Sequence, residues 1–462
     1  MENNDLFEEF DPTSSKAWKQ RIQFDLKGAD YNKTLIWDSP ENISVKPFYH
    51  QDDLQGKNLA ETSSIPQCKV GQHIYVGNEK PANKKALKAL GRGADSIVFL
   101  IPSEKIKIDI LLHGIELASA SIHFEMQFLS HDYIQQIKRY VGTKKANITL
   151  NIDIIGNLAR NGNWFHNLNR DHEILTKILK DDLTAVGIKS LSVDVSLYQN
   201  AGANRVQQLA YALAHANEYL FFAKKNSLTP IFDITFKVSI DSNYFFEIAK
   251  LRALRVLWKT LSAKYDLDTD CHIVATPTTR NKTLYDPYVN MLRTTTEYMS
   301  GVLGGANTIH SKTYDAVFSK DNEFSERISL NQLLIIKEEA YLKKVSNPSD
   351  GSYYIESLTE QMAEKALTIF KSIEAGGGFL KQLKAHNIQK KIKDSAKKEQ
   401  IQFNKKEKIL VGSNKYLNQM DGMKEEIQIY PFLKTKARKT LLEPIVPKRL
   451  AEEFEKKRLQ KE

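Results

Sequence analysis

Short apolar runs alternate with longer amphipathic stretches along most of this chain. The runs have the length of buried strands, and the stretches between them repeat apolar residues at the three- and four-residue spacing of helices. The predicted strands are Ser96–Ile101, Ala120–Met126, Ile148–Ile155, Ser190–Leu197, Phe232–Ile240, Cys271–Pro277, Ala306–Ile309 and Tyr353–Ile355. This repeat predicts an α/β fold, either a (β/α)8 TIM barrel, which needs ~250 residues, or a doubly wound open sheet.

The chain before and after the repeat has a different pattern. Residues 1–60 predict an N-terminal arm, in which Ser14 and Ser15 cap a helix that Gly28 ends, and residues 33–49 alternate like an extended strand. The aromatic side chains of this arm must be buried, either on the chain's own barrel or on a partner subunit, and the pattern leaves both open. The repeat lies within residues 61–380, and residues 381–462 predict a mostly helical tail.

Composition narrows the classes of partner. The 462 residues are 41% hydrophobic, which is ample for a large core, and Lys+Arg 66 against Asp+Glu 56 gives a net charge of +10. A nucleic-acid or acyl-CoA phosphate surface would account for this excess, but the lysines are spread out, which favours a solvated surface. No RNA- or DNA-binding signature accompanies them, so no nucleic-acid partner is expected. Cys68 and Cys271 form neither a disulfide framework nor a metal pattern.

Neither the start of the chain nor any apolar run indicates a membrane. The first ten residues are acidic and lack the basic and apolar regions of a secretion signal. A membrane-spanning helix needs ~20 apolar residues, and no run approaches that length. We therefore expect a cytoplasmic protein without a membrane partner.

The stretch from Tyr288 to Tyr354 carries the most specific pattern. Its first part is an amphipathic helix that Gly304 and Gly305 end, because glycine enters the left-handed cap conformation without strain. A buried strand follows, and the polar cluster His310, Ser311, Lys312 and Asp315 comes directly after it. In a barrel of alternating strands and helices, chemistry usually lies at such a position after a strand.

The same stretch resembles the methylmalonyl-CoA mutase family. The residues that carry the resemblance are Arg293-Thr-Thr-Thr-Glu-Tyr-Met-Ser-Gly-Val-Leu-Gly-Gly305, Arg327-Ile328, Asn331-Gln-Leu-Leu334, Glu338-Glu339 and Gly351-Ser-Tyr-Tyr-Ile-Glu356. The resemblance favours the TIM barrel over the open sheet. It also implies the interconversion of methylmalonyl-CoA and succinyl-CoA through a carbon radical that adenosylcobalamin supplies.

The cobalamin-binding pattern of the family, Asp-x-His-x-x-Gly, has one near match, Asp270-Cys-His272-Ile-Val-Ala275. It ends in alanine and lies inside a predicted barrel strand, whereas the family's glycine lets a loop turn the histidine toward cobalt. The predicted helical tail is also too short for the family's separate cobalamin domain. We therefore expect no cobalamin-binding domain and no cofactor bound by this chain.

Other positions of the family's site are also changed. Ser196 and Leu197 stand where the family has a Tyr-His pair, and leucine cannot donate a hydrogen bond to a thioester. Val274 replaces a glutamine, and the family's asparagine and glutamate near the corrin correspond to Lys312 and Ala316. The degenerate site positions are thus Ser196, Leu197, His272, Val274, Lys312 and Ala316. We expect no catalytic, cofactor-binding or metal-binding residue.

The strand residues further predict a closed barrel interior. Seven large apolar residues are expected to fill it as a packed core without a channel for a pantetheine chain: Val98, Leu100, Ile122, Phe124, Met126, Ile152 and Ile154. The histidines are expected to be structural or on the surface, since none lies in a recognisable ligand set: His113, His123, His166, His215 and His310.

These departures lead to one hypothesis with two rivals. The chain is expected to be the small, non-catalytic subunit of a heterodimeric mutase of propionate metabolism, whose large subunit holds substrate and adenosylcobalamin. An active acyl-CoA mutase chain that uses a separate cobalamin-binding subunit is the first alternative. A stand-alone CoA-binding scaffold is the second, and it predicts a stable monomer with an open, polar barrel axis.

Overall fold

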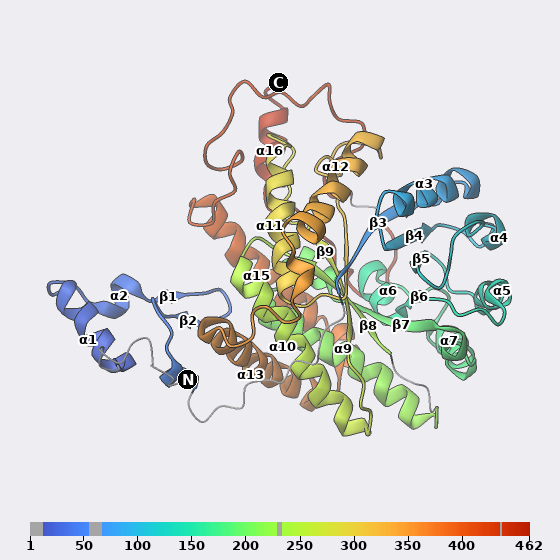
Figure 1. Ribbon diagram of the computed structural model, residues 1–462, viewed down its shortest axis with the longest axis horizontal. Coiled ribbons are helices and arrows are strands. Elements are labelled where there is room, and N and C mark those ends of the chain that lie inside the picture. Colours follow the sequence, from blue (N-terminus) through green and yellow to red (C-terminus); the bar gives the residue numbers. More distant parts are fainter. Residues whose placement is uncertain (1–12, 55–66, 229–232, 435–436) are drawn as a thin grey trace, which may run out of the picture.

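The computed structural model describes residues 13–54, 67–228, 233–434 and 437–462. Its centre is a closed barrel of parallel strands in the order β10-β3-β4-β5-β6-β7-β8-β9, with helices around it (Figure 1). The strands are β3 (Lys69–Tyr75), β4 (Ser96–Ile101), β5 (Ser121–Met126), β6 (Ile148–Ile152), β7 (Ile188–Asp194), β8 (Thr235–Ile240), β9 (His272–Pro277) and β10 (Thr308–His310). The predicted (β/α)8 TIM barrel is confirmed.

One predicted strand is wrong, and one strand of the barrel was not predicted. The segment Tyr353–Ile355 begins helix α13 (Tyr353–Ala375), because the residues after it continue with helical spacing and outweigh a few strand-forming side chains. The first strand of the barrel is instead β3, which was not predicted. Its apolar pattern is weak because Gly71 and His73 occupy alternate positions of the strand.

The helices that cover the barrel bury their apolar stripes against the outer face of the sheet. One ring contact shows the packing, since Phe236 of β8 lies against Trp258 of α10 with centroids 5.3 Å apart. The covering helices are α3 (Glu79–Gly91), α4 (Ile108–Leu111), α5 (His131–Val141), α6 (Ile154–Asn161), α7 (Leu168–Lys180), α8 (Ser196–Asn200), α9 (Arg205–Lys225), α10 (Tyr244–Ser262), α11 (Val289–Leu303), α12 (Glu323–Leu334) and α13. No helix among the described residues is long and apolar enough to cross a bilayer.

The barrel interior differs from the prediction of an apolar packed core. Ser96 of β4 and His310 of β10 meet inside it, with Oγ and Nε2 3.0 Å apart, and the rings of His123 and His310 are 5.2 Å apart. Because side chains alternate along a strand, the neighbours Ile122 and Phe124 face outward. Of the seven residues predicted to fill the interior, Val98 and Leu100 share the inward face with Ser96. Ile122, Phe124, Met126, Ile152 and Ile154 pack in the outer hydrophobic core.

The N-terminal arm projects from one side of the barrel (Figure 1). It contains α1 (Ser15–Asp25), α2 (Tyr31–Leu35) and an antiparallel hairpin of β1 (Trp37–Asp38) and β2 (Ser44–Val45). Ser14 caps α1 as predicted, since its hydroxyl accepts a hydrogen bond from the backbone of Ala17 at 3.2 Å. The extended segment predicted for residues 33–49 is confined to the hairpin. The described part of the arm contacts the barrel through Trp37, whose ring lies 5.5 Å from that of Phe246.

The tail is less helical than predicted. After α14 (Phe379–Lys384) and α15 (Asn387–Asn404), the described residues contain no helix until α16 (Glu452–Leu459). In the segment after α15, side chains bind the backbone in place of helical hydrogen bonds. For example, the side-chain amide of Asn414 donates to the carbonyls of Phe403 and Lys408. The long connection is held on the barrel by contacts with the loops after its strands, which are described below.

Acid sensitivity follows from the polar interior. Burial lowers the pKa of His123 to about 3 and that of His310 well below its usual value. In the unfolded chain these histidines have a pKa of ~6.5. Below that pH the unfolded chain therefore binds more protons than the folded chain, and the free energy of unfolding falls as the pH decreases from 6.5 toward 4. Each buried histidine contributes up to ~1.4 kcal/mol per pH unit to the unfolding free energy.

Urea unfolding between pH 7.5 and 4.5 measures this effect. His123→Gln should reduce the slope of unfolding free energy against pH by about one proton. His113→Gln is the matched control, because the imidazole of His113 is exposed. An equal change in slope for both variants would contradict the assignment to the barrel interior.

Candidate functional site

The carboxyl ends of the barrel strands carry a network of charged side chains. Lys237 of β8 donates to Glu125 of β5 at 2.7 Å, and its Nζ lies 3.7 Å from Asp194 of β7. Arg160 of α6 also binds Asp194. Burial opposes ionisation of Glu125, but Lys237 and other nearby cations outweigh it and lower the pKa of Glu125 to about 2. Each charge in the network therefore has a partner of opposite sign.

The network can be reached by water. His73 of β3 lies against His310, with ring centroids 5.1 Å apart, and its side chain is exposed. Tyr75, at the end of the same strand, is also exposed. Below them His310, His123 and Ser96 are buried and fill the axis. The interior is thus lined mainly by polar side chains, with Val98 and Leu100 among them, and it is accessible at its carboxyl end and filled by side chains in its middle.

A second polar cluster lies at the carboxyl ends of β9 and β10. Lys282 and Glu297 form a buried ion pair at 2.8 Å, and the side chain of Asn281 donates to the same carboxylate at 2.7 Å. Burial raises the pKa of Glu297 to about 7 although Lys282 opposes the shift. Burial and the charge of Lys282 together lower the pKa of Lys312 to about 8. The backbone of Lys312 donates to the hydroxyl of Tyr298 at 2.8 Å.

The six positions singled out in the sequence do not gather in one place. Ser196 begins α8 and donates to Asp194, so it joins the charged network. Leu197 is 3% exposed and packs in the hydrophobic core. Val274 is buried in β9 opposite Lys237 and Thr308. Ala316 is exposed.

His272 and Lys312 lie toward opposite ends of the barrel. His272 opens β9 at its amino end and pairs with Thr235 of β8, while Lys312 follows the carboxyl end of β10. The imidazole of His272 faces the axis, 6.3 Å from the ring of His123. A histidine held in a barrel strand cannot turn out to bind cobalt, so these residues do not fit cobalamin. No group of three or more potential metal ligands occurs among the described residues.

The tail crosses the loops at the carboxyl end of the barrel. We call residues 441–450 the strap. Its backbone amides donate five hydrogen bonds to carbonyls that follow the barrel strands: Leu441 to Gly162 at 2.9 Å, Leu442 to Gly162 at 3.2 Å, Ile445 to Ala159 of α6 at 2.8 Å, Lys448 to Asn200 of α8 at 3.1 Å and Leu450 to Arg280 at 2.8 Å. Arg280 in turn donates to the carbonyl of Lys448 at 2.8 Å. The strap therefore covers the mouth on the side of α6, α8 and β9.

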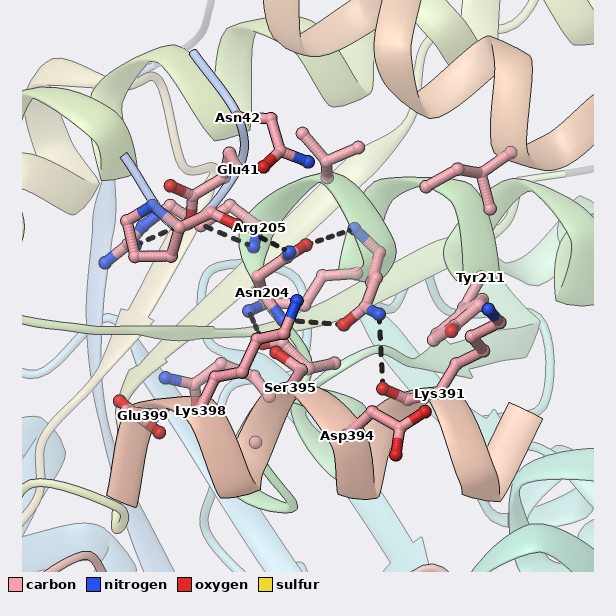
Figure 2. Close-up of a pocket in the computed structure, with 18 of the residues that line it drawn as sticks. Glu41, Asn42, Asn204, Arg205, Tyr211, Lys391, Asp394, Ser395, Lys398 and Glu399 are labelled. Atoms are coloured by element: carbon pink, nitrogen blue, oxygen red, sulfur yellow. Dashed lines mark hydrogen bonds and ion pairs between the residues drawn. The ribbon is translucent and has the colours of Figure 1, made fainter. Parts of the chain in front are cut away.

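A wide groove lies between the arm and the barrel (Figure 2). The hairpin, the start of α9, α13 and α15 line it, and its volume is about 1750 Å³. At its floor the guanidinium of Arg205 binds three carboxylates, those of Glu41 at 3.1 Å, Asp241 at 3.3 Å and Glu247 at 2.7 Å. Glu41 belongs to the hairpin, so Arg205 joins the arm to the barrel.

Reasoning from the sequence missed both the charged network and the groove. The signal for the network was present as polar residues at every second position of two strands, Ser121-x-His123-x-Glu125 and Thr235-x-Lys237-x-Ser239. The apolar residues Ile122, Phe124 and Met126 of the first of these strands were instead predicted to face the interior. No local signal predicted the groove, because its walls come from four parts of the chain that are distant in sequence.

Comparison with known proteins identifies close relatives. The family model described as methylmalonyl-CoA mutase matches residues 103–459. The chain is 34% identical to the methylmalonyl-CoA mutase small subunit of Porphyromonas gingivalis, over 90% of this chain and 72% of that one. It is 28% identical to the methylmalonyl-CoA mutase of Rhizobium meliloti, over 87% of this chain and 64% of that protein. It is 26% identical to the large subunit of P. gingivalis, over 82% and 61% of the two chains. The chain thus spans less than two thirds of the last two relatives.

The strap gives a testable prediction at Gly162. This glycine has a φ of +75°, and a Cβ added to it would lie 2.6 Å from the carbonyl oxygen of Leu442. Gly162→Ala should therefore displace the strap and lower the unfolding free energy by ~1–3 kcal/mol. Limited proteolysis followed by mass spectrometry should show faster cleavage between residues 437 and 450.

Gly91→Ala is the matched control for that variant, since nothing lies within 4 Å of a Cβ added at this glycine. It should leave the rate of cleavage in the strap unchanged. Equal cleavage of the wild type and Gly162→Ala would show that the strap is not held at this contact.

Proposed function

The chain belongs to the methylmalonyl-CoA mutase family, and on this premise we propose that it is the small, non-catalytic subunit of a two-chain mutase. The observation that carries the proposal is the burial of Leu197 in the hydrophobic core. At this position the family resemblance calls for a histidine that meets substrate. An apolar side chain turned into the core can neither donate a hydrogen bond nor transfer a proton.

The surroundings of Leu197 support the same role. The neighbouring residue Ser196 donates to Asp194 of the charged network, in which Lys237 pairs with Glu125 and Arg160 pairs with Asp194. Lys312 places an amine where the family resemblance calls for a neutral amide, and the strap covers part of the mouth. A substrate carboxylate or thioester would have to break paired charges before it could bind here.

We assign adenosylcobalamin, which supplies the radical, to the partner chain. The residues of this chain do not fit the cofactor, since His272 is held in a barrel strand. One organism, P. gingivalis, has both a small-subunit and a large-subunit relative of this chain, which supports a pair of unequal subunits. We propose that the large subunit of such a pair holds the substrate and the cofactor.

The arm supports a role in subunit contact. Helix α1 buries none of its residues against the rest of the chain, and Trp18 and Phe24 on it are 50% and 75% exposed. Large aromatic side chains are enriched at protein interfaces and dominate their binding energy. We propose three parts with separate roles: an arm for contact with the partner (residues 1–60), a barrel (61–380) and a tail that covers its mouth (381–462).

The polar axis favours a second candidate, a barrel that binds CoA by itself. A pantetheine chain carries amides that polar side chains could bind. Against this reading, His123, His310 and Ser96 are each at most 1% exposed and fill the middle of the axis. The remaining alternative is an active acyl-CoA mutase chain that uses a separate cobalamin-binding subunit, and no contact described above favours it.

Co-expression with the cognate large chain tests the proposed role. The two chains should purify together, and mutase turnover should need the large chain and adenosylcobalamin. Ser196→Ala and Lys312→Gln, at two of the degenerate positions, should leave kcat of the complex within about twofold, since neither would touch substrate. Turnover by this chain alone would overturn the proposal, and binding of CoA by this chain alone would favour the second candidate.

The exposed aromatic residues of the arm provide a test of assembly. Trp18→Ala combined with Phe24→Ala should weaken binding of the large chain at least tenfold, because truncated interface aromatics commonly cost more than ~1 kcal/mol each. The stability of the isolated chain should change by less than ~0.5 kcal/mol, since both residues are exposed. Phe221→Ala, an exposed phenylalanine on α9, is the matched control. Equal affinities for wild type and arm variant would remove the arm from the interface.

A further inference from the structure

The groove between the arm and the barrel has a larger volume than a typical pocket for a small ligand. Pockets for small molecules and cofactors have volumes of about 300–1,000 Å³, whereas this groove has about 1750 Å³. It also runs along two helices, α13 and α15, with the hairpin of the arm as its third wall. These dimensions favour a segment of polypeptide over a nucleotide or an organic cofactor.

The wall formed by α15 is basic. Lys390, Lys391, Lys397 and Lys398 line the groove along this helix, and Lys365 faces it from α13. All four lysines of α15 are exposed, and no carboxylate of the described residues lies within ion-pair distance of any of the five ammonium groups. Figure 2 shows Lys391 and Lys398 on the side of α15 that faces α9. The lysine edge, as we call these five residues, is therefore free to receive negative charge.

The acidic residues of the groove do not cancel this charge. Glu41 and Asp241 are bound by Arg205, and Glu399 is bound by Arg280 at 2.6 Å and by Lys408. The carboxylate of Asp38 accepts from Ser44 at 2.6 Å. Arg205, Arg280 and Lys408 together balance Glu41, Asp241 and Glu399. The neutral hydroxyl of Ser44 leaves the charge of Asp38 in place, so Asp38, Asp394 and Glu407 are the remaining carboxylates of the lining. Five lysines thus face three carboxylates, and the surplus of charge is positive.

The other wall carries amide side chains, and Asn42, Asn204 and Gln207 line the groove opposite α15. Asn204 and Gln207 are engaged within the chain, since Asn204 donates to the carbonyl of Pro40 at 3.2 Å and Gln207 donates to the carbonyl of Lys391 at 3.3 Å. The second contact ties α9 to α15 at the base of the groove. The exposed amide of Asn42 can both donate to and accept from a peptide group, while the lysines select for acidic side chains.

We infer that this groove binds an acidic segment of the large subunit, with Glu or Asp side chains on the lysine edge and apolar side chains beside Trp37 and Ile369. The inference rests on the proposed function, because it takes the large subunit as the source. It adds the surface and the chemistry of the contact. Charged pairs at the rim of an interface steer association and fix orientation, and salt weakens them.

The first experiment tests the chemistry of the groove on the full chain alone. The probe is a fluorescent synthetic peptide of Glu, Phe and Leu, and its control carries Gln in place of every Glu. The Glu peptide should bind at least tenfold more tightly than the Gln peptide at low salt, and this preference should diminish as salt increases. Equal binding of both peptides, or no binding of either, would overturn the inference.

The second experiment places the contact on the lysine edge. Lys391→Glu combined with Lys398→Glu should weaken binding of the Glu peptide and of the large chain at least tenfold. Lys381→Glu combined with Lys384→Glu is the matched control, since both lysines are exposed on α14 outside the groove. Should the charge reversal prevent folding, Lys391→Gln with Lys398→Gln provides the same test with a smaller expected loss.

The comparison of the two ligands separates this inference from the proposed function. If the wild-type chain binds the large chain and the lysine-edge variant binds it equally well, the inference fails and the proposed function stands. If the wild-type chain does not bind the large chain at all, both fail.

A third experiment tests a different source of acidic residues. The chain's own start contains five, Glu2, Asp5, Glu8, Glu9 and Asp11. Deletion of residues 1–11 should leave the affinity for the Glu peptide within about twofold. A tenfold increase in affinity would identify the chain's own start as the competing occupant and overturn the assignment to the large subunit.

Discussion

The closure of the barrel is the constraint on which the rest of the structure depends. β10 is short, and it joins β3 through three residue pairs, the last of which sets His310 beside Gly71. A Cβ at Gly71 would lie 2.6 Å from the ring of His310, so only glycine leaves room for the histidine inside the barrel. Because residues alternate along each strand, this contact also fixes which face of every neighbouring strand looks inward. The polar interior and the apolar outer core are two consequences of the same register.

The barrel register explains why the charged side chains of the network at the mouth are paired with one another. Lys237, Glu125 and Asp194 lie on inward positions near the carboxyl ends of their strands, where water can still reach them. Their mutual pairing joins the carboxyl ends of β5, β7 and β8 through side chains. The strap binds beside this network, at α6 and α8, which carry Arg160 and Ser196. It does so through backbone amides, which places few demands on its sequence.

The sequence predicted the alternation of strands and helices, the class of fold and the cap at Ser14, since these depend on local spacing. It failed at β3 because glycine and histidine interrupt the apolar pattern, and it failed at the barrel interior because the larger apolar side chains were expected inside. A strand of a parallel barrel is buried on both faces, and in β5 the polar residues are the ones that face the axis. Ile122 and Phe124 were assigned to the interior, and His123, which lies between them, was assigned to no site.

At the degenerate positions, the sequence predicted the change of chemistry at Leu197, and the structure adds that this side chain is buried. The groove could not be predicted, because it forms only when the hairpin meets α9 and α15.

The attachment of the arm links the barrel to assembly. Arg205 holds Glu41 of the hairpin while it also binds Asp241 and Glu247 of the barrel, and all four side chains are largely buried. Three carboxylates around one guanidinium leave a surplus of two negative charges, which Lys250, at 2.5 Å from Glu247, and Lys408, at 4.0 Å from Asp241, offset. Breaking such a buried set costs more than breaking a surface pair, so the hairpin is fixed to the barrel while α1 extends beyond it. If the arm binds a partner chain as proposed, this fixed attachment of its exposed aromatic helix would reduce the entropy lost on association.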